Sequence, residues 1–231
     1  MHYLYLKRQP RVKTIALPHK FLSLFLLFSG FGLIISAAFP IFFYQLFVSP
    51  RFQAIIKPVP EEAVLGEKAE EIDYTQIGNW FSEMPRFSPL PSKITHYILS
   101  IPKLKINEAV VQIGGEGLKQ ALVQYEGTAL PGQFGNTVIF GHSVLPQFYN
   151  PKNYKTIFST LPTLKEGDEI FVDFDGIRYR YVVVKMIEVS PDDISVLEQH
   201  YDSEYLSLIT CVPPGTYLRR LIVRAKLVKI S

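Results

Sequence analysis

One long uncharged stretch constrains this chain more than any other feature. Residues 21–48 contain no Asp, Glu, Lys or Arg and consist mainly of Phe, Leu and Ile. A helix of about 20 apolar residues crosses the hydrocarbon core of a bilayer, so this stretch is long enough to span one. It runs past the small residues Ser36–Ala38 without a break, which favours a retained anchor over a cleaved signal peptide. We expect a transmembrane anchor over residues 21–48.

The charges on either side of the stretch predict its orientation. Acidic residues are absent from the first 20 positions, which carry five basic ones: Lys7, Arg8, Arg11, Lys13 and Lys20. Basic flanks stay in the cytoplasm, so we expect residues 1–20 to form a cytoplasmic tail of a single-pass protein of the cell membrane. The rest of the chain would lie outside the cytoplasm. Without that tail the formal charge falls from +3 to −2, and no basic cluster indicates a nucleic-acid partner.

The part after the anchor divides into two regions. Residues 49–93 are rich in proline, and we expect an extracytoplasmic stalk or linker there, in which residues 61–81 either form a short acidic helix or stay disordered. From residue 94 to 231, short β-rich runs alternate with turn signals, which predicts an antiparallel sandwich or barrel. Asp175-Gly176 predicts a tight hairpin turn. Helical pieces are expected at Gly117–Val123 and Asp192–His200.

A single cysteine, Cys211, ends one of these predicted strands, and Val212-Pro-Pro-Gly215 follows it. It has no partner for an intrachain disulfide, so outside the cytoplasm it is free, intermolecular or reactive. A lone cysteine is more often a small buried hydrophobe than a catalyst. A catalytic thiol also needs a neighbouring general base that accepts its proton.

Two further residues supply what a thiol catalyst needs. His142 ends the apolar run Asn136–Gly141, and a strand-end histidine can serve as a general acid and base. Arg220 begins the last predicted strand, which a short connection joins to the strand of Cys211. If those two strands are antiparallel neighbours, Arg220 and Cys211 lie at the same end of the sheet. A cation there would stabilise a developing oxyanion, although a solvated arginine on an outer face fits the same pattern.

Together these motifs resemble the sortase family, the membrane-anchored cysteine transpeptidases of bacterial cell surfaces. Leu208-Ile-Thr-Cys211 is similar to the end of the family's T-L-x-T-C signature. Asn136-Thr-Val-Ile-Phe-Gly-His142 is similar to its N-x-V-I-x-G-H segment, and Arg220-Leu-Ile-Val-Arg-Ala225 to its R-x-I-V-x-A/G strand. The resemblance covers about residues 95–231, with the motifs in the family's order.

The resemblance implies a mainly β fold, an eight-stranded β-barrel with short helices behind the N-terminal transmembrane helix. It implies Cys211 as nucleophile, His142 as general acid and base, and Arg220 as the oxyanion-stabilising cation, with Arg219 as the alternative if the strand register shifts by one. Thr210, Tyr217 and Leu218 are its candidate substrate-binding residues. The residues between Ser190 and Tyr205 are a further candidate for peptide selection.

The resemblance also implies partners and a reaction. Members of the family cleave a sorting motif, often LPxTG-like, near the C-terminus of a secreted protein, and form a thioester. An amine acceptor, from a cell-wall precursor or a protein, then takes the acyl group. No cofactor or metal is expected, and we interpret Glu108, Asp192 and Asp193 as scattered surface carboxylates.

Two features bear on the class within the family. Gln124 stands where many members carry a histidine, so a second active-site histidine is not expected. The stalk has no Asp-Pro-aromatic motif, which speaks against the pilus-polymerising type.

Two other functions stay open at this point. One is a membrane-tethered thiol hydrolase, in which water resolves the acyl-enzyme. The other is a non-catalytic extracytoplasmic β-domain that binds proteins and buries an inert Cys211.

Overall fold

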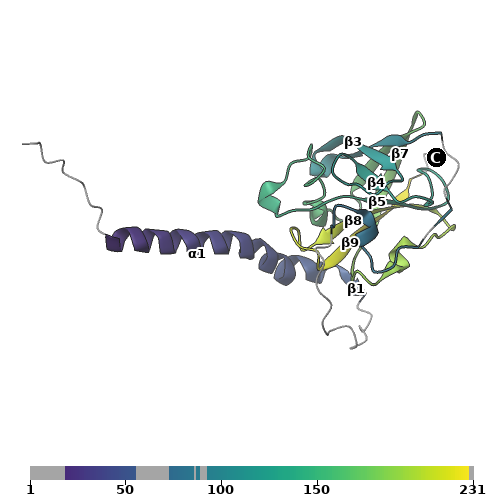
Figure 1. Ribbon diagram of the computed structural model, residues 1–231. Helices are drawn as coiled ribbons and strands as arrows, with labels where there is room; N and C mark the ends of the chain where they lie inside the picture. The colour runs from purple at the N-terminus through teal and green to yellow at the C-terminus, as the bar shows by residue number, and fades with distance from the viewer. Residues whose placement is uncertain (1–18, 56–72, 86, 89–92, 229–231) are drawn as a thin grey trace, which may run out of the picture. The chain divides into compact units, whose positions relative to one another are not determined.

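The computed structural model describes residues 19–55, 73–85, 87–88 and 93–228 (Figure 1). The chain divides into two compact units between Phe39 and Pro40. The first contains most of helix α1 (His19–Phe43). By length and composition, one helical stretch in the described part, Phe21–Arg51, suffices to cross a membrane, with a mean hydropathy of 2.2.

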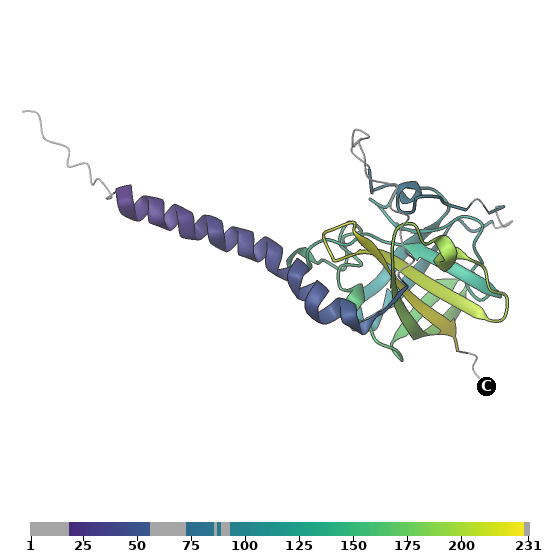
Figure 2. The ribbon, with the colours of Figure 1, turned by 90° about the horizontal axis from the view of Figure 1, so that it is seen from below.

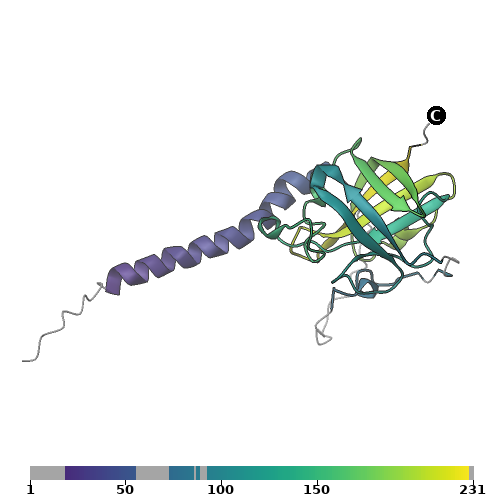
Figure 3. The same cartoon turned by 90° about the horizontal axis from the view of Figure 1, so that it is seen from above.

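The second unit is a closed β-barrel. Its eight strands are β2 (His96–Ile101), β3 (Ile106–Ile113), β4 (Leu122–Gln124), β5 (Gly135–Phe140), β6 (Glu169–Phe174), β7 (Ile177–Val189), β8 (Glu204–Val212) and β9 (Arg219–Leu227). They follow the order β7-β6-β2-β3-β4-β5-β8-β9, and β9 pairs back with β7, which closes the ring. Figures 2 and 3 show these strands curving around a common interior. The expected eight-stranded barrel is confirmed.

Short helical turns connect the strands. They are η3 (Ile77–Asn79), η4 (Pro102–Leu104), η5 (Pro146–Phe148), η6 (Leu161–Thr163) and η7 (Ile194–Leu197). The expected helix at Asp192–His200 is therefore only the single turn η7. In the range 61–81, residues 61–72 lie outside the described residues, and the remainder contains only η3.

Among the eight barrel strands, two pairs are parallel, which corrects the expectation of a wholly antiparallel sheet. β3 runs parallel to β4, and β5 runs parallel to β8. Parallel neighbours need a long crossover connection, and more than 60 residues separate β5 from β8. The expected helix at Gly117–Val123 is wrong, because Leu122 and Val123 are buried strand residues paired with β3.

The barrel has apolar residues on both sides of its wall. On β9, Leu221 and Val223 belong to the interior core cluster, whereas Ile222 belongs to a second cluster on the outer face. This follows from the alternation of side chains along a strand. Cys211 belongs to the outer cluster together with Ile209, so the thiol lies outside the barrel's interior.

The residues that follow α1 form part of the barrel unit, and we call Tyr44–Ile55 the junction segment. It comprises the π-helical turn η1 (Tyr44–Val48), the 3-10 turn η2 (Ser49–Arg51) and the strand β1 (Gln53–Ile55). β1 pairs in parallel with the end of β7. Tyr44 and Phe52 are buried in the interior core cluster. Part of the range expected to be a stalk is thus built into the sheet.

The β6–β7 hairpin forms as the sequence predicts. Phe174 pairs with Ile177, and the two residues between them both have positive φ, 53° for Asp175 and 74° for Gly176. Positive φ at both central positions is the conformation of the hairpin turn whose twist matches the strands. Glycine adopts this conformation without steric cost.

We expect Gly176→Ala to destabilise the chain by about 1 kcal/mol, since a left-handed conformation costs roughly that much for a residue with a Cβ. Nothing lies within 4 Å of the added Cβ, so the effect would come from the backbone alone. The matched control is Gly117→Ala, which also has open space and no left-handed φ. Urea unfolding of the full chain in detergent, followed by the fluorescence of the single tryptophan, Trp80, measures the difference. Equal midpoints for the two variants would refute the backbone explanation.

Candidate active site

The parallel pair of β5 and β8 brings the histidine and the cysteine to the same end of the barrel. Its last paired residues are Phe140 and Ile209. Beyond them the contact continues, because the Gly141 N–H donates to the carbonyl of Ile209 at 3.1 Å and the Thr210 hydroxyl donates to the carbonyl of Gly141 at 2.8 Å. The next residues in this register are His142 and Cys211.

One more bond fixes this end of the pair. The Ser143 hydroxyl donates to the carbonyl of Cys211 at 2.6 Å, so the residues on both sides of the histidine are tied to β8. Thr210 is fully buried, and its hydroxyl is engaged in its bond to Gly141. The contribution of Thr210 that the structure shows is to hold the strand ends together.

Gly141 is required by close packing. A Cβ at this position would lie 2.4 Å from a ring carbon of Phe158 and 2.6 Å from a methyl carbon of Leu122. Both neighbours are buried, so neither can easily move aside. The glycine before His142 therefore lets the strand end pass tightly over the barrel wall.

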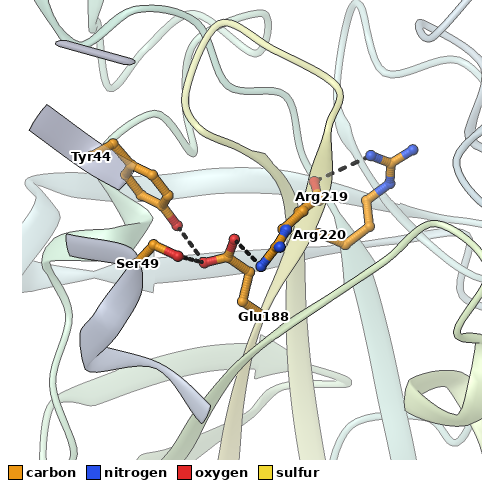
Figure 4. Close-up of polar contacts among 5 residues, drawn as sticks. All are labelled: Tyr44, Ser49, Glu188, Arg219 and Arg220. Carbon is orange, nitrogen blue, oxygen red and sulfur yellow. Dashed lines mark hydrogen bonds and ion pairs between the residues drawn. The ribbon is translucent and has the colours of Figure 1, made fainter. Parts of the chain in front are cut away.

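The antiparallel pair of β8 and β9 places an arginine opposite the thiol. Cys211 and Arg220 are direct partners in the register, and Arg219 pairs with Val212. The two arginines lead to opposite faces: the Arg219 guanidinium contacts the carboxylate of Glu188, and Arg220 extends away from it (Figure 4). The register therefore puts Arg220, and not Arg219, across from Cys211.

The Arg220 guanidinium is buried and is held by carbonyl groups. Its Nε donates to the carbonyl of Trp80 at 2.8 Å, and its Nη1 donates to the carbonyl of Tyr217 at 2.9 Å. The rings of Tyr74, Trp80 and Phe81 lie 5.7–5.9 Å from its central carbon. Within the described ranges no carboxylate forms an ion pair with Arg220. Its charge is therefore available to stabilise a negative charge that develops beside Cys211.

Burial sets the protonation of the cysteine and the histidine. Desolvation raises the pKa of the Cys211 thiol to about 11, and the nearby charge of Arg220 opposes part of this rise. Desolvation also lowers the pKa of His142 to about 4, against an opposing effect of Asp73. Both groups are therefore neutral near pH 7. Nε2 of His142 is buried and has no hydrogen-bond partner among the described residues.

A segment before the barrel covers this site, and we call Asp73–Pro85 the cover segment. It is bound to the barrel by a bridge between Gln76 and Gly117 and lies along one side of the barrel in Figure 2. The Trp80 ring is fully buried and lies 5.8 Å from the His142 ring. With this segment in place Cys211 is only 2% exposed.

Trp80 and Phe81 of the cover segment are buried against the barrel. The sequence did not predict the main contact of this segment. The carbonyl of Trp80 as a partner of Arg220 was not predicted, because a backbone group carries no sequence signal. Tyr74 was also missed, although it stacks on Tyr217 with ring centroids 4.1 Å apart.

The other residues singled out in the sequence differ in how exposed their side chains are. Tyr217 and Leu218 are about half exposed in the β8–β9 loop, beside the covered site. Gln124 is fully buried and donates to the carbonyl of Ala129 at 3.1 Å, so it is part of the barrel packing.

The three side chains interpreted as surface carboxylates differ in burial and in hydrogen bonding. Asp193 is fully buried and accepts hydrogen bonds from the backbone and side chain of Ser195, which corrects its interpretation as a surface carboxylate. Asp192 accepts a hydrogen bond from Ser82, and Glu108 is exposed on β3. Among the described residues, no group of three or more His, Cys, Asp or Glu side chains is placed to hold a metal ion.

The sortase-domain family model matches residues 99–228, which is more than half of the chain. This chain belongs to the sortase family. The matched residues include the three motifs that carried the resemblance. Two relatives are sortase A of Bacillus anthracis, 27% identical over 168 residues (72% of each chain), and sortase D of Bacillus subtilis, 27% identical over 133 residues. The second match covers 56% of this chain and 62% of that relative, less than two thirds of its length.

Solved sortase structures share the fold. Sortase C-1 of Actinomyces oris superposes with a TM-score of 0.53 at 26% identity, and covers 60% of this chain and 77% of its own. Sortase A of Corynebacterium diphtheriae gives 0.52 at 29% identity, with 61% and 63% covered. Sortases named A, C and D all occur among the similar proteins, so the comparisons favour no single class.

The raised thiol pKa predicts how Cys211 reacts with an alkylating reagent. The thiolate is the reactive form, so the rate of iodoacetamide modification should rise about tenfold per pH unit from pH 7 to pH 10. A small thiol such as glutathione, measured alongside, should begin to level off near its own pKa of about 8.5–9. The rate is measured on the full chain by mass spectrometry. A Cys211 rate that levels off below pH 8 would contradict the neutral thiol described above.

Proposed function

We propose that this sortase is a cysteine transpeptidase that cleaves an LPxTG-like sorting motif of secreted proteins and transfers the acyl group to an amine. The observation that carries this proposal is the paired register of three strands. It sets Cys211 across from Arg220 and extends to His142 at the same end of the barrel. A nucleophile, a proton carrier and an oxyanion-stabilising cation are the groups that acyl transfer needs.

The first half-reaction would form a thioester. The Cys211 sulfur attacks the carbonyl carbon before the scissile peptide bond, and its proton passes to His142. Arg220 stabilises the oxyanion of the tetrahedral intermediate. The C–N bond then breaks, and His142 returns the proton to the leaving amine. Because thiol and imidazole are both neutral at rest, the proton needed by the leaving group is already on the enzyme.

The second half-reaction would release the product. The acceptor amine attacks the thioester carbonyl, the C–S bond breaks, and the thiol recovers a proton from the attacking amine by way of His142. The acceptor would be a cell-wall precursor or a protein amine. For the peptide to reach Cys211, the cover segment must first move, because the thiol is only 2% exposed beneath it.

The location we propose follows from the N-terminal part of the chain. The apolar helix that begins at Phe21 anchors the protein in the cell membrane as a single span. The basic residues before it keep the N-terminus in the cytoplasm, and the barrel lies outside, where secreted proteins carry their sorting motifs.

Two substitutions test the catalytic assignment. Cys211→Ala should abolish turnover of an LPxTG-type peptide, and His142→Ala should lower kcat/KM by about 10²–10⁴, the usual contribution of a general acid and base. His96→Ala is the matched control, since His96 is exposed at the start of β2 and should retain full activity. Peptide cleavage is measured with the full chain in detergent. Turnover by the Cys211→Ala chain would overturn the proposal.

The acceptor is tested in the same assay. With an added amine such as triglycine, the ligated peptide should replace the hydrolysed one as the main product. Hydrolysis that ignores the amine would indicate a thiol hydrolase. No cleavage at all by the wild-type chain would indicate a binding domain.

A further inference from the structure

Glu188 is a buried carboxylate that the reaction does not use. It lies on β7, is only 3% exposed, and pairs with Leu221 of β9, one position along from the pair of Val189 and Arg220. Side chains paired across antiparallel strands share a face, so Glu188 lies on the face opposite to that of Arg220. A buried acid so near the catalytic strand calls for an explanation.

Three donors from two parts of the chain converge on this carboxylate (Figure 4). The Ser49 hydroxyl donates to Oε2 at 2.9 Å, and the Tyr44 hydroxyl donates to the same oxygen at 3.3 Å. Both residues belong to the junction segment. The other oxygen, Oε1, lies 3.4 Å from Nη1 of Arg219 at the start of β9. Glu188 therefore connects the junction segment to β9.

The contacts continue from Arg219 to the catalytic arginine. Nη1 of Arg220 donates to the carbonyl of Arg219 at 3.2 Å, as Figure 4 shows. Arg219 is thus held at both ends, by Glu188 at its guanidinium and by Arg220 at its carbonyl. A continuous polar chain runs from the junction segment through Glu188 and Arg219 to Arg220.

Three members of this polar chain, Ser49, Glu188 and Arg219, also line a cavity of about 250 Å³. Gln45 and Ser49 of the junction segment line one part, and Pro213 and Leu218 of the β8–β9 loop line another. Glu188 and Arg219 complete the lining. The junction segment and the β8–β9 loop therefore line the same cavity, so a shift of one segment would change the packing of the other.

Stability alone does not account for this arrangement. Glu188 loses its hydration, whereas the Arg219 side chain is 42% exposed and solvent screens its charge, so this ion pair adds little net stability. What a buried, hydrogen-bonded charge does provide is a fixed position for each of its partners. Here the partners are the junction segment on one side and the strand of the catalytic arginine on the other.

We propose that Glu188 is a positioning residue for the transpeptidation reaction: it couples the junction segment to β9 and holds Arg220 in place across from Cys211. This inference rests on the proposed function, because it assigns a role within that reaction. It makes the junction segment a working part of the enzyme and not only a tether.

The test is Glu188→Gln in the full chain, with Glu169→Gln as the matched control. Glu169 also pairs with an arginine of the barrel, Arg180 at 3.3 Å, but it is about half exposed. We expect Glu188→Gln to lower kcat by about tenfold to a hundredfold with little change in KM, because a displacement of about 1 Å in a catalytic group costs up to about 10²-fold. Glu169→Gln should match the wild type.

Two further variants separate positioning from general damage to the fold. Arg219→Lys keeps a cation near Glu188 and should retain most of kcat, whereas Arg219→Met should resemble Glu188→Gln. Ser49→Ala removes one donor from the partly buried junction segment and should lower kcat by a smaller factor. Thermal unfolding of each variant identifies any that fails to fold.

Hydrogen exchange provides a readout that does not depend on turnover. Amides of the junction segment should exchange faster in Glu188→Gln than in the wild type, and at the wild-type rate in Glu169→Gln. Unchanged exchange in Glu188→Gln would overturn the coupling, and unchanged kcat in an active enzyme would overturn the positioning role. Lack of peptide turnover by the wild-type chain would instead count against the proposed function and leave the exchange result to decide the coupling.

Discussion

The parallel pairing of β5 with β8 is the constraint on which the rest of the candidate active site depends. It sets the end of the histidine strand beside the end of the cysteine strand, and the bonds from Thr210 and Ser143 fix that alignment. The antiparallel pairing of β8 with β9 then adds Arg220 across from Cys211. His142, which lies far from the other two residues in the sequence, is therefore brought to Cys211 and Arg220 by strand pairing, and two side-chain hydroxyls reinforce that pairing.

Burial on the outer face of this sheet determines the protonation of Cys211 and His142 in the absence of substrate. The thiol, the imidazole and the guanidinium are all buried beneath the cover segment, and desolvation keeps the thiol and the imidazole neutral. The Arg220 guanidinium is held there by carbonyl groups and aromatic rings. A thiolate–imidazolium ion pair between Cys211 and His142 is thus not the resting state. The proton that the proposed reaction would transfer is on the thiol at rest.

Local alternation and turn chemistry predicted a β sandwich or barrel with the Asp175-Gly176 hairpin, and the motifs that resemble sortases implied the eight-stranded barrel and the three strand ends. The sequence could not predict that β5 and β8 are parallel, since the pairing partners are more than 60 residues apart. Leu122 and Val123 were mistaken for a helix end because the strand β4 has only three residues, too few to show a period. The carbonyl of Trp80 and the carboxylate of Glu188 became evident only from the packing, where their partners come from distant segments.

The central claim is that Cys211 carries the acyl group of a cleaved peptide. The most direct test is mass spectrometry of the full chain mixed briefly with an LPxTG-type peptide and quenched in acid. The account predicts a mass increase equal to the N-terminal peptide fragment, located on Cys211 and removed by a later addition of amine. A chain that cleaves the peptide while Cys211 stays unmodified, or that carries the fragment on another residue, would contradict it.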